Sequence, residues 1–226
     1  MTLRLKRLKQ LKRRHRRLDA DGLPALGGRQ RLFDATLRLA AKTRSIHALG
    51  LREIGREAGL NPNTFYRHFR DLDELAHALV DDIGTELRRE LRERRLRATA
   101  GEDAAAQTVD YVFDFALRRP EAISVAVREI HGASPSLRLA LRKLIDGIAS
   151  DMAEDARTMK LTPGLDAISL HRLCAIVVEH IFYRCLDVIE QPRQRAQLLR
   201  EAVEFITMLF AGAMLRTSLT PGKTKP

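Results

Sequence analysis

Aromatic residues are scarce in this chain: they make up 5% of its 226 residues, and tryptophan is absent. This scarcity argues mildly against a site for flat aromatic compounds, which usually need stacking partners. Cysteine is almost absent as well, with only Cys174 and Cys185. A single predicted helix would hold these two thiols about 16 Å apart, too far for a disulfide. We therefore expect a reduced, cytoplasmic protein.

Long apolar runs and catalytic signatures are also missing. No 18-residue apolar stretch occurs, so we expect no membrane span, and the N-terminus lacks the apolar core of a secretory signal. The chain has no nucleophile elbow, no Gly-rich phosphate loop, no HExxH motif and no clustered metal ligands. His171 and His180 lie nine residues apart, near but not on one helix face. We expect no enzyme, no metal and no cofactor.

The pattern that is present is helical. Apolar residues recur at helical spacing and no alternating strand pattern occurs, which predicts an all-α fold of about nine helices. We expect residues 88–97, which are highly charged, to be solvated, and residues 98–101 to form a loop. The remaining helices are bounded by prolines. The predicted helices cover residues 29–42, 51–58, a short segment after Asn61, a long rod from residue 72, then 102–118, 121–131, 135–160, 167–190 and 193–215.

Residues 51–75, LREIGREAGLNPNTFYRHFRDLDEL, carry the most information. Gly59 suits the end of one helix, and Asn61 with Pro62 suits the start of a very short second one. Gly50 offers no side-chain cap to the first helix, although Glu53 is placed to close half a capping box. Two short helices joined by a tight turn make a helix-turn-helix, whose second helix lies in a DNA major groove.

This segment resembles the DNA-binding region of TetR-type transcriptional regulators. Their signature of a glycine-containing turn followed by T-F/L-Y-x-H/Y-F is present as TFYRHF at residues 64–69, followed by Asp71, Glu74 and Leu75. The longer string TFYRHFRDLDEL is similar to FabR/DesT-type regulators of unsaturated fatty acid synthesis. The resemblance implies a homodimeric regulator with a second, helical domain, whose ligands in that group are acyl thioesters with opposed effects of saturated and unsaturated chains.

Polar side chains at the start of the second helix are the candidates for DNA contact. Asn63 and Thr64 can reach base edges, whereas Tyr66 and His68 can donate to phosphates. Phe65 and Phe69 are predicted to pack inward. Any single polar residue here can instead be simply solvated. The predicted DNA-contacting residues are Arg52, Arg56, Asn63, Thr64, Tyr66, Arg67 and His68, with Arg13 and Arg14 from the N-terminal arm.

The N-terminal arm holds most of the excess charge. Residues 1–17 contain nine Lys or Arg and no acid, out of a net charge of +11 for the chain. Such an arm can follow phosphates or enter a minor groove. Because Leu5, Leu8 and Leu11 recur every three residues, a basic amphipathic helix on a membrane surface is an alternative. A further alternative is that the arm is a solvated tail, or that it is sequence upstream of the true start of the protein.

The later helices supply candidates for dimerisation and ligand binding. The last two predicted helices each have a wide apolar face, which predicts a two-fold interface of four helices. The alternative is that these faces form intrachain core. The candidate interface residues are Leu173, Val177, Ile181, Phe205 and Leu209. An aliphatic lining in the central helices suits an acyl chain, or a plain core equally well. In RPEAISVAVREIHGAS, which resembles the middle of FabR/DesT-type proteins, Arg128 and His131 can meet an anionic head group or form helix-to-helix contacts. The predicted ligand-lining residues are Val109, Val112, Phe113, Ala116, Ile123, Val127, Arg128, His131, Leu141, Ile148 and Met152.

These features combine into one prediction of organisation and function. We expect a basic arm and linker (1–28), a helix-turn-helix domain (29–71), a helical regulatory and dimerisation domain (72–216) and a flexible tail (217–226). The predicted function is a homodimeric, nucleoid-associated repressor that binds a palindromic operator in double-stranded DNA. A small hydrophobic effector, such as a long-chain acyl-CoA, would modulate it and so control lipid genes. The alternatives are a regulator for an unrelated hydrophobic drug or metabolite, and a DNA-bound scaffold that acts through a protein partner.

Overall fold

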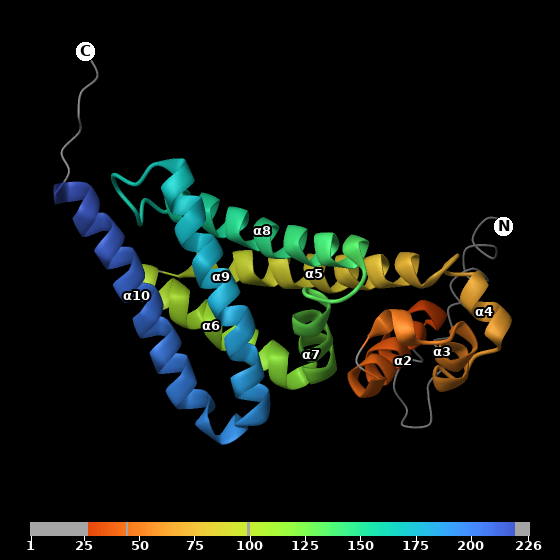
Figure 1. Ribbon diagram of the computed structural model, residues 1–226. Helices are drawn as coiled ribbons and strands as arrows, with labels where there is room; N and C mark the ends of the chain where they lie inside the picture. Colours follow the sequence, from red (N-terminus) through yellow and green to blue (C-terminus); the bar gives the residue numbers. More distant parts are fainter. Residues whose placement is uncertain (1–26, 44, 99, 220–226) are drawn as a thin grey trace, which may run out of the picture.

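The computed structural model describes residues 27–43, 45–98 and 100–219, and within them every regular element is helical (Figure 1). Nine α-helices and two short 3₁₀ helices occur there, without a strand, which confirms the predicted all-α fold. The elements are α2 (Gly28–Thr43), η1 (Ile46–Ala48), α3 (Leu51–Glu57), α4 (Pro62–Tyr66), α5 (Leu72–Arg97), α6 (Gly101–Arg118), α7 (Pro120–Glu129), α8 (Pro135–Thr158), α9 (Ala167–Glu190), η2 (Pro192–Gln194) and α10 (Arg195–Leu219).

Short-range capping explains where the N-terminal helices begin. Glu53 accepts the backbone N–H of Gly50 at 3.4 Å, the half box expected where no side-chain cap is available. Gly59 has φ of 61°, the left-handed conformation that ends α3. Asn61 accepts the N–H of Asn63 at 2.9 Å and starts α4. Asp71 accepts the N–H of Glu74 at 2.8 Å and starts α5.

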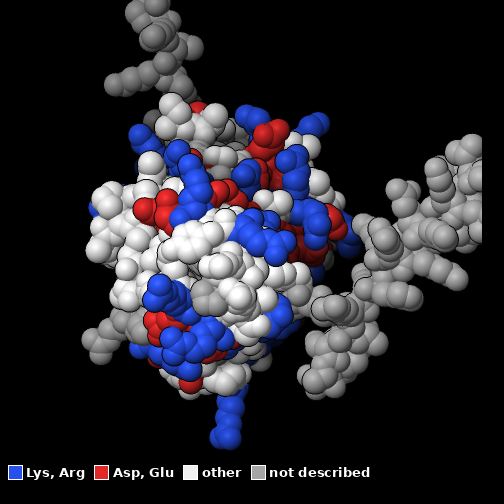
Figure 2. All heavy atoms as spheres, turned by 90° about the vertical axis from the view of Figure 1, so that its right-hand side faces the viewer, with Lys and Arg blue, Asp and Glu red and all other residues white. Residues whose placement is uncertain are grey.

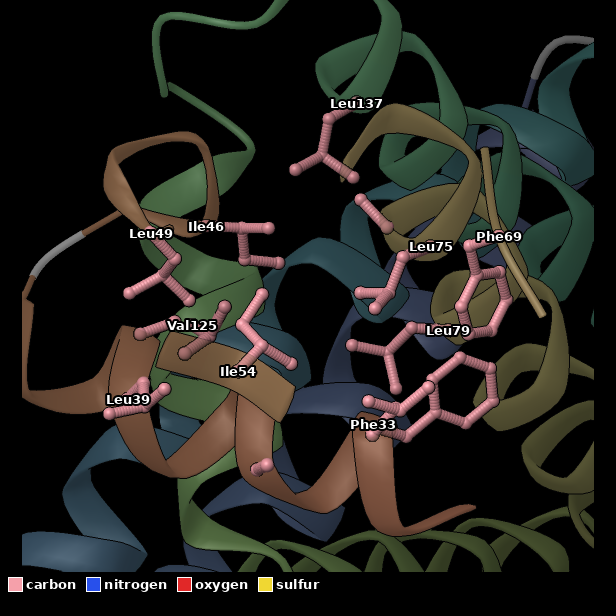
Figure 3. Close-up of a cluster of buried hydrophobic side chains, with 14 of the residues drawn as sticks. Phe33, Leu39, Ile46, Leu49, Ile54, Phe69, Leu75, Leu79, Val125 and Leu137 are labelled. Atoms are coloured by element: carbon pink, nitrogen blue, oxygen red, sulfur yellow. The ribbon is translucent and has the colours of Figure 1, made fainter. Parts of the chain in front are cut away.

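Aromatic side chains form the centre of the N-terminal unit (Figure 3). Phe65 and Phe69 are 0% and 4% exposed, which confirms that they point inward. The Phe69 ring lies 5.6 Å from that of Phe33 on α2. Leu75 and Leu79 of α5 belong to the same cluster. Full burial of such side chains stabilises by about 1.5–3 kcal/mol each, enough to fix the short α4 against α2 and α5.

The C-terminal part is a bundle in which α5 packs on α6 and α8, and α9 packs on α8 (Figure 1). The long α5 runs from the helix-turn-helix into this bundle and contributes to both cores. Its charged end departs from the prediction of a solvated segment: Arg95 is only 5% exposed and lies against Asp155 of α8. The helix continues to Arg97 because this end packs on α8.

The two units share one continuous core at the junction (Figure 3). Val125 of α7 lies in the same buried cluster as Leu39 of α2, Ile46 of η1 and Leu49. Leu137 at the start of α8 joins this cluster. Movement of α7 or α8 relative to η1 would therefore disturb apolar packing of the helix-turn-helix unit.

Candidate DNA-binding surface and internal cavity

The exposed face of α4 carries the predicted DNA-contacting residues. Tyr66 is 63% exposed, and Asn63, Arg67 and His68 are also exposed, whereas Thr64 is half-buried. The buried Phe65 on the same helix holds α4 against the core. The structure therefore brings these five polar side chains together on one short segment, supported from below by aromatic packing.

Cations near α4 fall into two groups. Arg52 and Arg56 on α3 and Arg67 after α4 are exposed, and none forms an ion pair within the described part of the chain. Arg38 and Arg70 are instead held by Glu57 and Glu74, at 2.9 and 3.0 Å. Figure 2 views the molecule from the end where α4 lies and shows Lys and Arg side chains around an uncharged central surface. The first group leaves positive charge available for phosphates.

Helix α2 braces the turn that presents α4. Arg31 donates from Nη2 to the carbonyl of Gly59 at 3.0 Å. A Cβ atom on Gly28 would lie 2.9 Å from Nε2 of His68, so the start of α2 lies directly beside this ring. Arg13 and Arg14, predicted to contact DNA from the arm, lie outside the described residues.

A cavity of about 340 Å³ lies inside the C-terminal bundle. This volume is within the range of about 300–1,000 Å³ typical of ligand pockets. Its wall is almost wholly apolar, and it follows α5 along the residues Leu79, Ile83, Leu87, Leu91 and Arg95. Leu37 of α2 and Ile46 of η1 also belong to the wall, so the cavity reaches the helix-turn-helix unit.

The structure places only some of the predicted ligand-lining residues in this wall. Those present are Val109, Val112, Ile123, Leu141, Ile148 and Met152. Phe113 and Ala116 are instead fully buried in the core cluster that holds Val188, and Val127 packs against that cluster. The cavity uses the face of α6 that carries Thr108, Val109, Val112 and Phe115. Phe113 lies to one side of this face, whereas Ala116, four residues after Val112 on the same face, is fully buried in the core and is not part of the wall.

Arg128 and His131, predicted to meet a ligand head group, also lie outside the wall and have other partners. Arg128 donates to the carbonyls of Ala40 and Ala41, at 3.0 and 3.4 Å, at the end of α2. His131 is hydrogen-bonded to the Tyr183 hydroxyl at 2.9 Å. Both residues thus form the helix-to-helix contacts that the sequence left open as an alternative.

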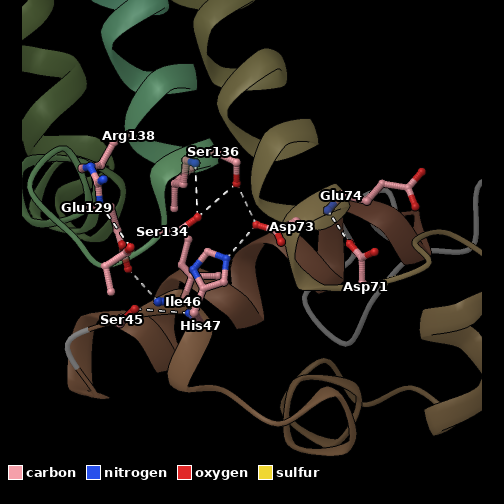
Figure 4. Close-up of polar contacts among 12 residues, drawn as sticks. Ser45, Ile46, His47, Asp71, Asp73, Glu74, Glu129, Ser134, Ser136 and Arg138 are labelled. Carbon is pink, nitrogen blue, oxygen red and sulfur yellow. Dashed lines mark hydrogen bonds and ion pairs between the residues drawn. The ribbon is translucent and has the colours of Figure 1, made fainter.

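The neighbouring Glu129 is a junction residue to which the sequence analysis gave no role. Its Oε1 accepts the N–H of Ile46 at 2.7 Å, and the side chain is buried. Close by, Asp73 accepts from His47 at 2.8 Å and from Ser136 at 3.0 Å (Figure 4). The His47 contact, with that of Ser136, lowers the pKa of Asp73. These bonds connect η1 to α5, α7 and α8.

The predicted dimer residues divide between two faces. Val177 and Ile181 are 3% and 7% exposed and line the cavity of their own chain, so they do not face outward as predicted. Helix α9 is apolar on more than one side, and Val177 and Ile181 share the side that lines the cavity. Leu173, Phe205 and Leu209 are half-buried. Exposed apolar side chains on α9 and α10 are Ile168, Ile176, Tyr183, Met208 and Leu215.

Neither a metal-binding cluster nor a membrane-spanning helix occurs among the described residues. No group of three or more His, Cys, Asp or Glu side chains there is arranged to hold a metal ion. None of the described helices combines the length and apolar character needed to cross a membrane.

An exposed polar helix presented by a helix-turn-helix, and joined by a long rod to a hollow helical bundle, defines a helix-turn-helix transcriptional regulator. Residues 32–79 match the family model of bacterial regulatory proteins of the tetR family. That match covers the helix-turn-helix and the start of α5. Residues 32–79 thus form a helix-turn-helix domain of the tetR type.

Solved structures share this fold across most of their length. The fatty acid degradation regulator FadR from Bacillus halodurans superposes with a TM-score of 0.69 at 15% identity, covering 80% of this chain and 95% of its own. FadR from Bacillus subtilis, in complex with stearoyl-CoA, gives 0.62 at 15% identity, with 81% and 98% covered. Reduced NemR from E. coli gives 0.62 at 15% identity, with 81% and 98% covered.

Proposed function

We propose that the protein is a repressor of fatty acid or lipid genes whose operator affinity is set by a long-chain acyl-CoA or another acyl thioester. The observation that carries the proposal is the composition of the cavity wall. It is apolar along α5, and it includes Leu37 and Ile46 of the helix-turn-helix unit. An acyl chain in this cavity would touch the DNA-binding unit directly. The sequence similarity to FabR/DesT-type regulators and the stearoyl-CoA bound to the Bacillus subtilis neighbour support this ligand class.

The regulatory mechanism follows from differential binding. A ligand changes DNA affinity only if it binds two conformers with different affinity. Here the conformers would differ in how α5 and α7 lie against η1, because Glu129 and Asp73 bridge that boundary. Pivoting of α5 would change the separation of two recognition helices. One turn of DNA is about 34–36 Å, so a shift of a few ångströms would misalign one half-site.

The proposed operator contact requires a homodimer, with Asn63 and Thr64 at base edges and the unpaired arginines on phosphates. We assign the dimer surface to α9 and α10. In place of Val177 and Ile181, the exposed Ile176 and Tyr183 on α9, with Met208 and Leu215 on α10, are the better candidates. These four side chains are apolar and exposed in the single chain, as an interface surface would be.

The test is fluorescence anisotropy of the full chain on DNA from beside its own gene, at fixed salt, with saturated and unsaturated long-chain acyl-CoA. We expect a palindrome-specific complex whose affinity changes with acyl-CoA. A Val112→Trp variant should bind DNA but lose the response, since the indole fills the cavity. Leu139→Trp, at an exposed position on α8 that is not in the wall, is the matched control. Because the chain has no tryptophan of its own, the emission of each variant reports its burial.

Other outcomes would point to the alternatives. Tight DNA binding indifferent to every acyl-CoA would overturn the lipid part of the proposal. If an unrelated drug or metabolite then changed the affinity, the cavity would serve that compound. If no small molecule did, a scaffold acting through a protein partner would account for the DNA binding.

A further inference from the structure

One end of the cavity holds a buried ion pair in a largely apolar wall. Arg95 on α5 and Asp155 on α8 are 5% and 1% exposed, and both belong to the wall. Nε of Arg95 donates to Oδ2 of Asp155 at 2.9 Å. Arg92 approaches the other carboxylate oxygen at 3.5 Å. This pair lies at the opposite end of the α5 lining from Leu79.

The pair leaves hydrogen-bonding capacity unused. Nη2 of Arg95 is buried and has no hydrogen-bond partner within the described residues. Buried polar atoms are almost always paired, and a buried donor without an acceptor costs about 1–3 kcal/mol or more when it is charged. A donor of this kind in the wall of an apolar cavity therefore indicates a missing acceptor.

The charge balance of the cluster specifies the kind of acceptor. Arg95 and the half-exposed Arg92 share the single carboxylate of Asp155, which leaves one positive charge in excess. Oδ1 of Asp155 is also buried and has only the 3.5 Å contact with Arg92. One turn away, Arg88 and Asp151 satisfy each other through two bonds of 2.7 and 2.8 Å. Two other acids line the cavity: Glu102 is exposed, and Glu129 accepts from Ile46 at Oε1, while its Oε2 is buried without a hydrogen bond among the described residues. An oxygen acceptor, strongest when negatively charged, fits the free guanidinium edge.

We propose that Arg95 anchors the head of an acyl ligand, with Nη2 donating to its acyl oxygen. That oxygen belongs either to the carboxylate of a free fatty acid or to the thioester carbonyl of an acyl-CoA. The proposal rests on the proposed function, since it assumes an acyl chain in the cavity. From Arg95 the chain runs along α5 toward Leu79, a distance of roughly 24 Å at 1.5 Å per residue.

Anchoring one end gives the cavity a way to distinguish chains. With the head fixed at Arg95, the length and bend of the chain decide whether its methyl end reaches Leu37 and Ile46. Both of these residues belong to the helix-turn-helix unit and to the cavity wall. The length and bend of the acyl chain would thus be sensed at the domain junction, while the ion pair holds the head of the ligand in place.

A purely structural ion pair is the competing explanation, and a double variant separates the two. Arg95→Met alone leaves the carboxylate of Asp155 buried with only the looser Arg92 contact, so the folded state of this single variant should be destabilised. Replacing a whole buried pair by apolar side chains is often neutral or stabilising. The Arg95→Met/Asp155→Leu variant should therefore fold and bind DNA as the wild type does. Arg97→Met, which removes an exposed arginine paired to Glu93 on the same helix, is the control.

Isothermal titration with palmitate and with palmitoyl-CoA, both below their micellar concentrations, measures the anchor directly. We expect the double variant to melt at or above the wild-type temperature and to lose roughly tenfold or more in affinity. Loss for palmitate alone assigns the anchor to a carboxylate, and loss for both assigns it to an acyl oxygen in either ligand. Wild-type affinity of the double variant for both ligands would overturn the anchor and leave the proposed function intact. Failure of the wild-type protein to bind either ligand would overturn both.

Discussion

Glu129 ties α7 to η1, because its Oε1 accepts the backbone N–H of Ile46 at 2.7 Å across the domain junction (Figure 4). Both residues are 2% exposed, and both line the cavity. The adjacent Arg128 donates to the carbonyls of Ala40 and Ala41. Two successive side chains at the end of α7 thus hold the end of α2 and the start of η1. A ligand that displaces α7 would displace the helix-turn-helix with it.

Removal of this contact should uncouple the two units. Glu129→Ala leaves the buried N–H of Ile46 without an acceptor, which should lower the free energy of unfolding by about 1–3 kcal/mol. We also expect a smaller ratio between the DNA affinities measured with and without palmitoyl-CoA. Chemical denaturation and anisotropy provide the two readouts. The control is Glu121→Ala at an exposed position of the same helix; an unchanged ratio in Glu129→Ala would exclude this contact from the coupling.

Tyr66→Phe tests the proposed phosphate contact. The Tyr66 side chain is 63% exposed, and its hydroxyl has no hydrogen bond within the described part of the chain, so stability should not change. Binding should weaken to a similar extent on operator and non-operator DNA, because phosphate contacts carry no sequence information. Ser150→Ala on α8 removes an exposed hydroxyl away from the helix-turn-helix and should leave DNA affinity unchanged. Equal affinity of Tyr66→Phe and wild type would remove Tyr66 from the contact set.

Asn63→Ala tests base recognition at the start of α4. Asn63 is exposed, and its side chain takes no part in capping the helix, which Asn61 does. A lost base contact should cost about 1–3 kcal/mol on the operator and little on unrelated DNA. Competition titrations with the two DNAs give the specificity ratio. A parallel loss on both DNAs would assign Asn63 to the backbone instead of the bases.

Features that depend on neighbouring residues in the chain could be predicted from the sequence. Gly59, Asn61 and Asp71 act within a few residues of themselves, so their roles as helix ends and caps follow from local chemistry. The inward packing of Phe65 and Phe69 follows from their spacing on one helix face. The predicted helix at residues 167–190 also has the bounds of α9, because the signals that end it, such as Pro192, are local in the sequence.

Features that depend on which helices become neighbours could not be predicted. The sequence shows that α9 is apolar on more than one side, but it does not show which side lines the cavity. Val177 and Ile181 were therefore assigned to the dimer surface. Arg95 stands in a run of arginines, and only the packing of α8 against α5 gives it a buried partner in Asp155. Likewise, Arg128 and Glu129 find their acceptor and donor more than eighty residues earlier in the chain.

Both thiols should be unreactive in the folded protein. Burial raises the pKa of Cys174 and of Cys185 to about 12. The thiolate is the reactive species and is therefore scarce at neutral pH. We expect Ellman's reagent to modify neither thiol promptly in the native state and both in denaturant. Ser150→Cys, at an exposed position on α8, supplies a reactive control. Prompt modification of the wild-type protein would contradict this burial and would favour thiol-based sensing.

The Arg88–Asp151 pair should make stability depend on pH in the acid range. The hydrogen bonds from Arg88 lower the pKa of Asp151 below its ordinary value of 3.8. A lowered folded-state pKa means that the contribution is present above about pH 4 and is lost as the pH falls through the folded value. Asp151→Asn should therefore lower the free energy of unfolding near pH 7, and the deficit should shrink toward about pH 3. Its size should be modest, about 0.2–1 kcal/mol, because Arg88 is 45% exposed.

Urea denaturation of wild type and Asp151→Asn at the two pH values measures this deficit. Glu154→Gln is the matched control, since Glu154 is exposed on the same helix and has no cation partner in the described part of the chain. Its effect should be near zero at neutral pH. Arg88 lies on the stretch of α5 between Leu87 and Leu91, which both line the cavity. A deficit that stayed constant with pH would mean that Asp151 stabilises α8 by packing and not by its charge, and that the ion pair does not hold α5 in place.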